Sequence, residues 1–254
     1  MKEWVARRAD ILLITLDTLR YDAAQTAWHQ GQLEALGPHL GAQGWEERHS
    51  PASFTYAAHQ AFLAGFLPTP LGPGPHARLF AAEFAGSSST TEDTFTFEQA
   101  SLPEALQARG YHTVCIGGTG FFNQANALSR VIPSLFAESH WRPELGVTDP
   151  QSPRHQVAQA LACRDSRPNF TLLNISAIHQ PNRFYTGADQ DDLASHTAAL
   201  LAVDQALLEL FRVERPTFVI ACSDHGTAYG EDGYHGHRLG HPVVWTVPYA
   251  HFSL

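Results

Sequence analysis

The chain has 254 residues, of which 44% are apolar and only 16% are charged, so it can fold around a substantial core. Its formal net charge of −9 argues against a nucleic-acid partner, because phosphate backbones are bound by clustered Lys and Arg. The apolar runs, roughly 6 to 8 residues long, fall far short of the ~20 residues of a membrane span, and residues 1–10 lack the apolar segment of a signal peptide. We therefore expect a cytoplasmic protein that binds neither nucleic acid nor membrane. No pattern in the sequence indicates an oligomeric state.

Short apolar runs alternate with helix-like stretches along the chain. The apolar runs are nearly continuous, which is typical of strands covered on both faces of a parallel sheet. The helices between them would supply the two covers. The sequence therefore predicts an α/β fold of three layers (α/β/α) with a mostly parallel central sheet. In chain order, the expected elements are a strand at 11–16, helices at 23–36, 57–64 and 102–108, strands at 113–116 and 170–175, a helix at 193–211, and strands at 217–222 and 243–247.

Residues 1–254 are expected to form a single domain, because neither an internal repeat nor a convincing linker interrupts the pattern. The exception is the stretch at about 66–96, which is rich in Pro, Gly and Ser. We interpret it as an excursion from the sheet, a loop or lid beside the site.

Two predicted strands end in ionisable residues. Asp17 follows the strand at 11–16, and Asp224 and His225 follow the strand at 217–222. Functional groups gather beyond the carboxyl ends of strands in open α/β sheets, so the three side chains could converge on one divalent cation. Oxygen ligands with one imidazole suit Zn²⁺ or Mn²⁺. For Asp17 alone, a simple helix cap is an equally good interpretation.

Thr55 lies at the amino end of the predicted helix at 57–64, which Gly65 terminates. The position suits an ordinary N-cap. It also suits a nucleophile, because free N–H groups and the helix dipole favour an alkoxide and a bound anion there. A metal ion in contact with the hydroxyl would lower its pKa.

Histidine is unusually frequent, with 15 residues, whereas the three cysteines form no CxxC pair and are expected to pack as reduced thiols. His59, one turn after Thr55, could face a substrate or solvent. Arg20 could pair with Asp22 near the site or lie at the surface. The remaining candidates cluster near the carboxyl end of the chain, at His235, His237 and His241.

Together these motifs resemble the alkaline phosphatase and sulfatase superfamily, in order and in spacing, over most of residues 10–252 apart from the excursion and parts of 124–168. The segments that carry the resemblance are ILLITLDTLRYD (11–22), Thr55 with Gly65 ten residues later, LPEALQARGYHT (102–113), SDHG (223–226) and GEDGYHGH (230–237). The resemblance implies an alkaline phosphatase-like fold and one metal site. That site would be formed by Asp17, Thr55, Asp224 and His225.

The same resemblance implies that His179 and His237 contact the substrate or a second metal. His59, His235, His241 and Arg20 would then lie in the surroundings of the site. Two-metal relatives have an Asp four residues before the mid-chain histidine, where this chain has Ile175. We therefore expect one divalent ion, Zn²⁺ or Mn²⁺, with a second, weakly held ion left open.

Departures from the family pattern favour phosphorus over sulfur. A formylglycine sulfatase has Cys or Ser in a C/S-x-P-x-R setting, whereas residues 55–59 read TYAAH. Gly118 stands where those sulfatases place a sulfate-binding Lys, and Thr18 stands where they have a second acid. Threonine instead resembles the nucleophile of the superfamily's phosphodiesterases, phosphonate hydrolases and phosphoethanolamine-type transferases.

We therefore expect a metal-dependent hydrolase or transferase that acts on a phosphate or phosphonate ester through Thr55. Its substrate would be a small molecule or a protein-linked ester. Two alternatives are a sulfuric ester hydrolase that works without formylglycine and a non-catalytic metal-binding protein. An ester panel and a metal analysis would separate these three hypotheses.

Overall fold

The computed structural model describes residues 1–65 and 100–254. Within these ranges, no helix is both long enough and apolar enough to cross a membrane. The predicted excursion at 66–96 lies outside the described residues, and the single domain over 1–254 stays a prediction. The elements are α1 (Lys2–Ala6), β1 (Asp10–Leu16), α2 (Tyr21–His29), β2 (Glu46–His49), α3 (Thr55–Ala64), α4 (Leu102–Gln107), β3 (His112–Ile116), α5 (Ala127–Val131), β4 (Glu138–His140), α6 (Ser152–Ala162), β5 (Asn169–Ile175), α7 (Leu193–Leu210), β6 (Thr217–Cys222), β7 (Ala228–Tyr229), β8 (His235–Gly236), α8 (Pro242–Trp245) and β9 (Thr246–Ser253).

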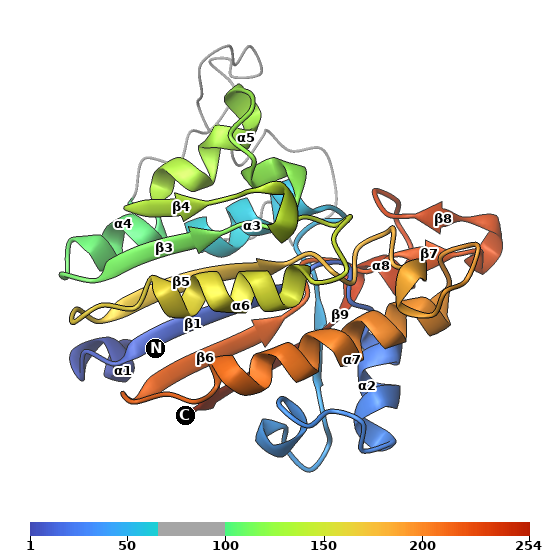
Figure 1. The fold of residues 1–254 in the computed structure, drawn as a ribbon, viewed down its shortest axis with the longest axis horizontal. Helices are drawn as coiled ribbons and strands as arrows, with labels where there is room; N and C mark the ends of the chain where they lie inside the picture. Colours follow the sequence, from blue (N-terminus) through green and yellow to red (C-terminus); the bar gives the residue numbers. More distant parts are fainter. Residues whose placement is uncertain (66–99) are drawn as a thin grey trace, which may run out of the picture.

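A seven-stranded sheet in the order β2-β9-β6-β1-β5-β3-β4 forms the middle of the molecule (Figure 1). The strands from β6 to β4 run parallel to one another, as the continuous apolar runs predicted. Strand β9 is antiparallel to both β6 and β2. Because β1 lies between β5 and β6, its carboxyl end is flanked by the ends of two further parallel strands.

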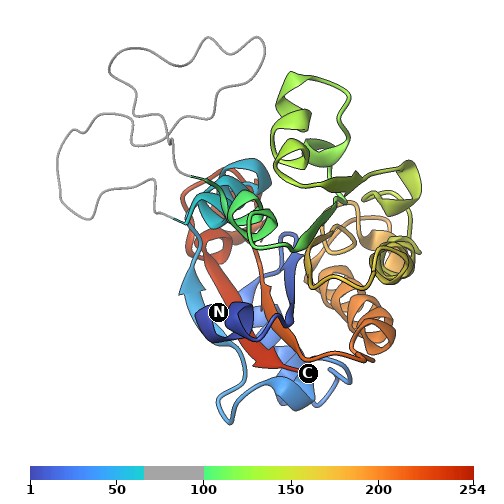
Figure 2. The ribbon, with the colours of Figure 1, turned by 90° about the vertical axis from the view of Figure 1, so that its left-hand side faces the viewer.

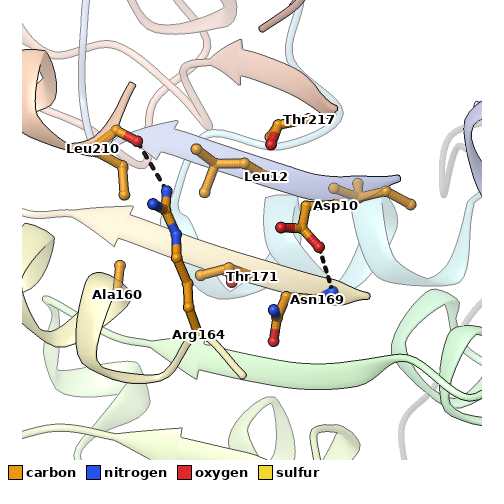
Figure 3. A pocket seen from close by; sticks show the side chains of 9 residues that line it. Asp10, Leu12, Ala160, Arg164, Asn169, Thr171, Leu210 and Thr217 are labelled. Carbon is orange, nitrogen blue, oxygen red and sulfur yellow. Dashed lines mark hydrogen bonds between the residues drawn. The ribbon is translucent and has the colours of Figure 1, made fainter. Parts of the chain in front are cut away.

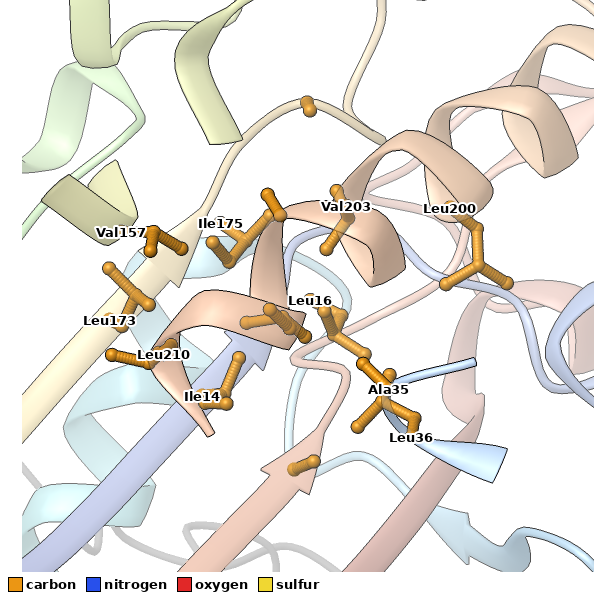
Figure 4. Packing of buried hydrophobic residues seen from close by; sticks show 14 of the residues in the cluster. Ile14, Leu16, Ala35, Leu36, Val157, Leu173, Ile175, Leu200, Val203 and Leu210 are labelled. Atoms are coloured by element: carbon orange, nitrogen blue, oxygen red, sulfur yellow. The ribbon is translucent and has the colours of Figure 1, made fainter. Parts of the chain in front are cut away.

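Helices cover both faces of this sheet, which confirms the three-layer prediction. Side chains alternate along β1, so that Leu12, Ile14 and Leu16 pack beneath α2, α6 and α7 (Figure 4). Ile11 and Leu13 face the opposite way, toward α3 and α4. Figure 2 shows the sheet between the two helix layers. Each central strand is therefore buried on both faces.

Polar contacts join neighbouring elements at the amino ends of the central strands. The Asp10 carboxylate accepts the backbone N–H of Asn169 at 2.8 Å, and Arg164 donates to the carbonyl of Leu210 at 2.9 Å (Figure 3). The cavity between them measures about 20 Å³, enough for roughly one water molecule. These contacts join β1 to β5 and the end of α6 to the end of α7 at this edge of the sheet.

Two expected elements are wrong in extent. The helix expected at 23–36 ends at His29, and Gly31 turns the chain with a φ of +68°. The strand expected at 243–247 begins instead as the single turn of α8, with Pro242 in its first turn, and β9 starts only at Thr246. Residues 30–36 keep apolar side chains at 33, 35 and 36, and residues 243–247 are a short apolar run, so periodicity alone could not separate helix, loop and strand.

Asp204, on α7, explains where the chain goes after α2. Its buried carboxylate accepts the backbone N–H groups of Glu34, Ala35 and Leu36 at 2.6, 2.9 and 2.9 Å. These three hydrogen bonds pair the backbone N–H groups of a segment that belongs to neither a helix nor a strand. They hold this segment against the α7 face of the core (Figure 4).

We predict that Asp204→Ala lowers the free energy of unfolding by about 3 to 5 kcal/mol, because three buried N–H groups lose a charged acceptor. Urea denaturation would measure the change. Glu209→Ala, an exposed acid on the same helix, is the matched control and should cost less than about 0.5 kcal/mol. An equal loss in the two variants would contradict the assigned role of Asp204.

Candidate metal centre

Three elements bring four side chains together at the carboxyl edge of the sheet. Asp17 follows β1 directly, and Asp224 and His225 follow the neighbouring strand β6. Thr55 is the first residue of α3, and Phe54 rather than Thr55 is the N-cap. Each of the four is at most 1% exposed. The structure thus places together the four residues that the sequence singled out.

The donor atoms of this group lie at separations typical of atoms around one ion. Thr55 Oγ1 lies 3.3 Å from both Asp17 Oδ2 and His225 Nε2. His225 Nε2 is 3.6 Å from Asp224 Oδ2 and 3.9 Å from Asp17 Oδ1. Donors in a tetrahedral zinc site would stand roughly 3.3 to 3.6 Å apart.

The two buried carboxylates repel each other. Burial and the neighbouring Asp224 raise the pKa of Asp17 to about 6, and burial raises the pKa of Asp224 to about 7. Among the described residues, Asp17 Oδ1 and Asp224 Oδ2 have no hydrogen-bond partner. Orphaned buried oxygens of this kind fit a cation, which would supply the missing positive charge.

The imidazole of His225 is oriented for metal binding. Its Nδ1 lies 2.9 Å from the carbonyl oxygen of Gly226, which can only accept a hydrogen bond, so Nδ1 carries the proton. The lone pair of Nε2 then faces the carboxylates. Oxygen donors with one imidazole suit Zn²⁺ or Mn²⁺.

Unusual backbone geometry holds the two carboxylates in place. Thr18 has a φ of +65°, rare for a β-branched residue, and its N–H donates to Asp224 Oδ1 at 3.2 Å. At Gly226 a Cβ would come within 2.0 Å of the carbonyl oxygen of Val243. Only glycine fits at position 226, because the backbone of α8 lies directly against it.

Asn174 and His59 form the surroundings of the four donors. The Asn174 side-chain oxygen accepts the backbone N–H of Gly118, so its amide nitrogen faces Asp17 Oδ2 at 3.0 Å and Thr15 Oγ1 at 3.3 Å. His59 contacts Thr15 Oγ1 through Nε2 at 2.9 Å and the Thr55 carbonyl through Nδ1 at 2.8 Å. A polar chain therefore connects the Asp17 carboxylate to the helix that carries Thr55.

The solvent-facing interpretation of His59 is wrong, because its side chain does not reach solvent and instead lies in the surroundings of the site that the resemblance implied. It is fully buried beneath the site, with Nδ1 3.7 Å from Asp224 Oδ2. Burial lowers its pKa to about 4, so the ring is neutral at pH 7. Its position one turn after Thr55 does not show which face of α3 packs against the sheet, and that buried face is the one that lies beneath the carboxylates.

His179 and His237 lie on the more open side of the centre. The His237 ring centroid is 4.6 Å from that of His225 and 5.3 Å from that of His179, and both rings are partly exposed. Burial and the neighbouring imidazoles lower the pKa of His237 to about 3, so this ring is neutral. Ile175, where two-metal relatives have an acid, is fully buried in the apolar core.

Arg20 is buried and forms ion pairs with Asp22, at 2.6 Å, and with Glu231. The pair with Asp22 was expected, and a surface role for Arg20 is wrong. The second pair connects the chain just after β1 to the loop before β8. His235 is exposed, and His241 contacts Asp232 and caps α8 through the N–H of Val243, so we assign neither to the site.

Sequence reasoning missed Asn174, Glu231 and His196. Asn174 had a signal, because it is the one amide in the middle of the apolar run of β5. His196 is fully buried, accepts the N–H of Arg20 at 3.2 Å and contacts the Tyr229 hydroxyl at 3.1 Å. Nothing in the sequence distinguishes it from a surface histidine of α7.

The fold has counterparts among known proteins. The chain is similar to the integral membrane protein lipooligosaccharide phosphoethanolamine transferase A (EptA) from Neisseria meningitidis, with a TM-score of 0.64 and 13% identity, covering 97% of this chain and 48% of that one. It is similar to the Zn complex of the C-terminal periplasmic domain of EcEptC from Escherichia coli (TM-score 0.64, 13% identity, coverage 96% and 72%). A protein in the alkaline phosphatase superfamily from Vibrio parahaemolyticus gives a TM-score of 0.62 at 14% identity, with coverage of 96% and 60%.

The chain spans about half the length of EptA, and identities this low show a shared fold alone. No curated protein sequence gives a match. The sequence model described as Sulfatase, in contrast, matches residues 10–249, which is nearly the whole chain. The chain therefore belongs to the sulfatase family, within the alkaline phosphatase superfamily that its motifs resemble.

Proposed function

We propose that the protein transfers a phosphoryl-type group from a phosphate or phosphonate ester to the hydroxyl of Thr55. The observation that carries this proposal is the position of that hydroxyl, 3.3 Å from both Asp17 Oδ2 and His225 Nε2 at the first turn of α3. A hydroxyl so placed shares its surroundings with two carboxylates and an imidazole, which is the arrangement of an activated nucleophile.

Asp17, Thr55, Asp224 and His225 would hold one divalent ion. Bound there, the ion would lower the pKa of the Thr55 hydroxyl and offset charge on the ester oxygens. The Zn in the similar E. coli EcEptC domain supports zinc, and Mn²⁺ suits the same donors. Asn174 and Thr18 would keep the two carboxylates aimed at the ion through the hydrogen bonds described above.

The residues around Thr55 suit an anionic substrate. No side chain caps the amino end of α3, so its backbone N–H groups and the positive end of its dipole are directed at the substrate group. His179 and His237, partly exposed beside His225, are placed to contact the transferred group or to hold a second, weakly bound ion.

The reaction would proceed in two displacements. The Thr55 oxygen would form a bond to phosphorus as the bond to the leaving alcohol oxygen breaks, and that alcohol would depart with a proton. Water or another acceptor would then attack phosphorus and release Thr55. Hydrolysis and transfer differ only in this acceptor.

Steric constraints at Gly118 disfavour the sulfatase alternative. A Cβ at Gly118 would come within 2.4 Å of the Ser176 Cβ and 2.6 Å of the Asn174 carbonyl oxygen. The sulfate-binding Lys that the family's sulfatases have at the position of Gly118, just after β3, therefore does not fit this backbone. The substrate and the cytoplasmic location stay predictions from the sequence.

We predict that Thr55→Ala lowers kcat/KM toward an aryl phosphate diester or phosphonate at least roughly 1,000-fold, because the attacking oxygen is removed. Matched aryl phosphate diester, phosphonate and sulfate esters would be assayed with wild type, Thr55→Ala and the distant control Thr197→Ala. Undiminished turnover in Thr55→Ala would exclude the nucleophile. Faster turnover of the sulfate would favour a sulfuric ester hydrolase, and no turnover by wild type would favour a metal-binding protein.

The raised pKa of Asp224 predicts a pH-dependent stability difference between wild type and Asp224→Asn. The folded pKa of Asp224, about 7, exceeds the unfolded value of about 3.9, so between these two pH values folding takes up one proton at Asp224. The free energy of unfolding of wild type therefore falls as the pH rises from about 4 through 7. In EDTA, Asp224→Asn should therefore gain in melting temperature relative to wild type between pH 5 and about 8. With Zn²⁺ the order should reverse, because the amide is a poorer ligand. A constant difference in EDTA would contradict the buried, uncompensated charge.

A further inference from the structure

A second group of metal-binding side chains lies away from the proposed centre, at the opposite edge of the sheet from β2. Glu138 and His140 are on the edge strand β4, and Cys163 directly follows α6. Strands β3 and β5 separate β4 from β1, a distance of roughly 14 Å across the sheet at ~4.8 Å per strand. Figure 1 shows α6 in front of these strands.

The donor atoms of this group converge. Cys163 Sγ lies 3.3 Å from His140 Nε2 and 3.5 Å from Glu138 Oε1, and His140 Nε2 lies 2.6 Å from Glu138 Oε1. The register places Glu138 and His140 on the same side of β4, because they are two residues apart. Two of the three separations match the roughly 3.3 to 3.6 Å expected between donors of a tetrahedral zinc ion.

We propose that Glu138, His140 and Cys163 form a second site for a divalent transition metal, with zinc as the best match. Thiolate, imidazole and carboxylate together are a borderline-soft donor set, which Mg²⁺ and Ca²⁺ do not select. The ion replaces the thiol proton, so that one thiolate and one carboxylate balance its charge of +2. Solvent takes the fourth position, because Glu138 and His140 have side chains 37% and 28% exposed.

His112 is the positioning residue of this site. It is the first residue of β3, and its side chain is only 9% exposed. Its Nε2 lies 2.8 Å from Glu138 Oε2, and its Nδ1 lies 3.3 Å from Asp165 Oδ2. The imidazole thereby holds the carboxylate oxygen that the ion does not use and leaves Oε1 directed at Cys163 and His140.

The bound ion would stabilise the edge of the sheet that β4 forms. Strand β4 has three residues and pairs only with β3 in the described part of the chain. Its ligands connect this edge to the end of α6, which also packs on β3, β5 and α7 and on the turn at Pro143–Leu145 that follows β4. The ion would take no part in the transfer proposed for Thr55, because the three ligands lie apart from that centre.

Cobalt titration tests this proposal, because a thiolate bound to Co²⁺ gives a near-ultraviolet charge-transfer band. The proposed centre around Thr55 contains no sulfur donor, so the band reports the second site alone. We expect Co²⁺ added until both sites are filled to produce the band in the full chain, with one thiolate-bound ion per chain, and Zn²⁺ to displace it. Cys163→Ser should abolish the band, and His140→Gln should weaken Co²⁺ binding at least tenfold.

Matched controls separate the two sites. Thr55→Ala removes a donor of the other centre, and Cys115→Ala removes a buried thiol of β3. Both variants should keep the band at full intensity. His112→Ala should keep the band but weaken Co²⁺ binding roughly 10-fold, which is the usual effect of removing a residue that orients a metal ligand. Circular dichroism would establish that each variant is folded. Absence of the band in wild type, or its persistence in folded Cys163→Ser, would overturn the proposal and leave a hydrogen-bonded cluster.

Discussion

The structure depends on one electrostatic constraint, the burial of Asp17 and Asp224 side by side at the ends of adjacent strands. Burial and the neighbouring Asp224 raise the pKa of Asp17, burial raises the pKa of Asp224, and each carboxylate has an oxygen without a hydrogen-bond partner in the described part of the chain. Such an arrangement costs folding free energy unless a cation is present, so packing alone does not account for it. The proposed activity derives from the effect that this cation would have on the Thr55 hydroxyl.

Much of the surrounding architecture serves to hold this pair. Parallel pairing of β1 and β6 brings the carboxylates together, and the positive φ of Thr18 aims its N–H at Asp224. Asn174 holds Asp17 from the strand on the other side. His59 then connects the same network to the first turn of α3, so hydrogen bonds join the helix that carries Thr55 to the carboxylates.

The sequence predicted the layers, the strands β1, β3, β5 and β6 of the seven-stranded sheet, and the residues that converge, because these features depend on local apolar runs and on the residues at their carboxyl ends. It could not predict that His59 points inward, since this requires knowledge of which face of α3 meets the sheet. Glu231 pairs with Arg20 across 211 residues, a contact that no local pattern encodes. The path of the chain after α2 depends on Asp204, which belongs to another element.

Metal content tests the central claim most directly. Elemental analysis would compare Cys163→Ser protein with the same protein carrying Asp224→Ala, both purified without chelators, so that the sulfur-containing site contributes to neither. We predict about one Zn or Mn per chain in the first protein and its loss in the second. No metal in the first protein after reconstitution, or equal metal in both, would contradict a metal centre built on Asp17 and Asp224.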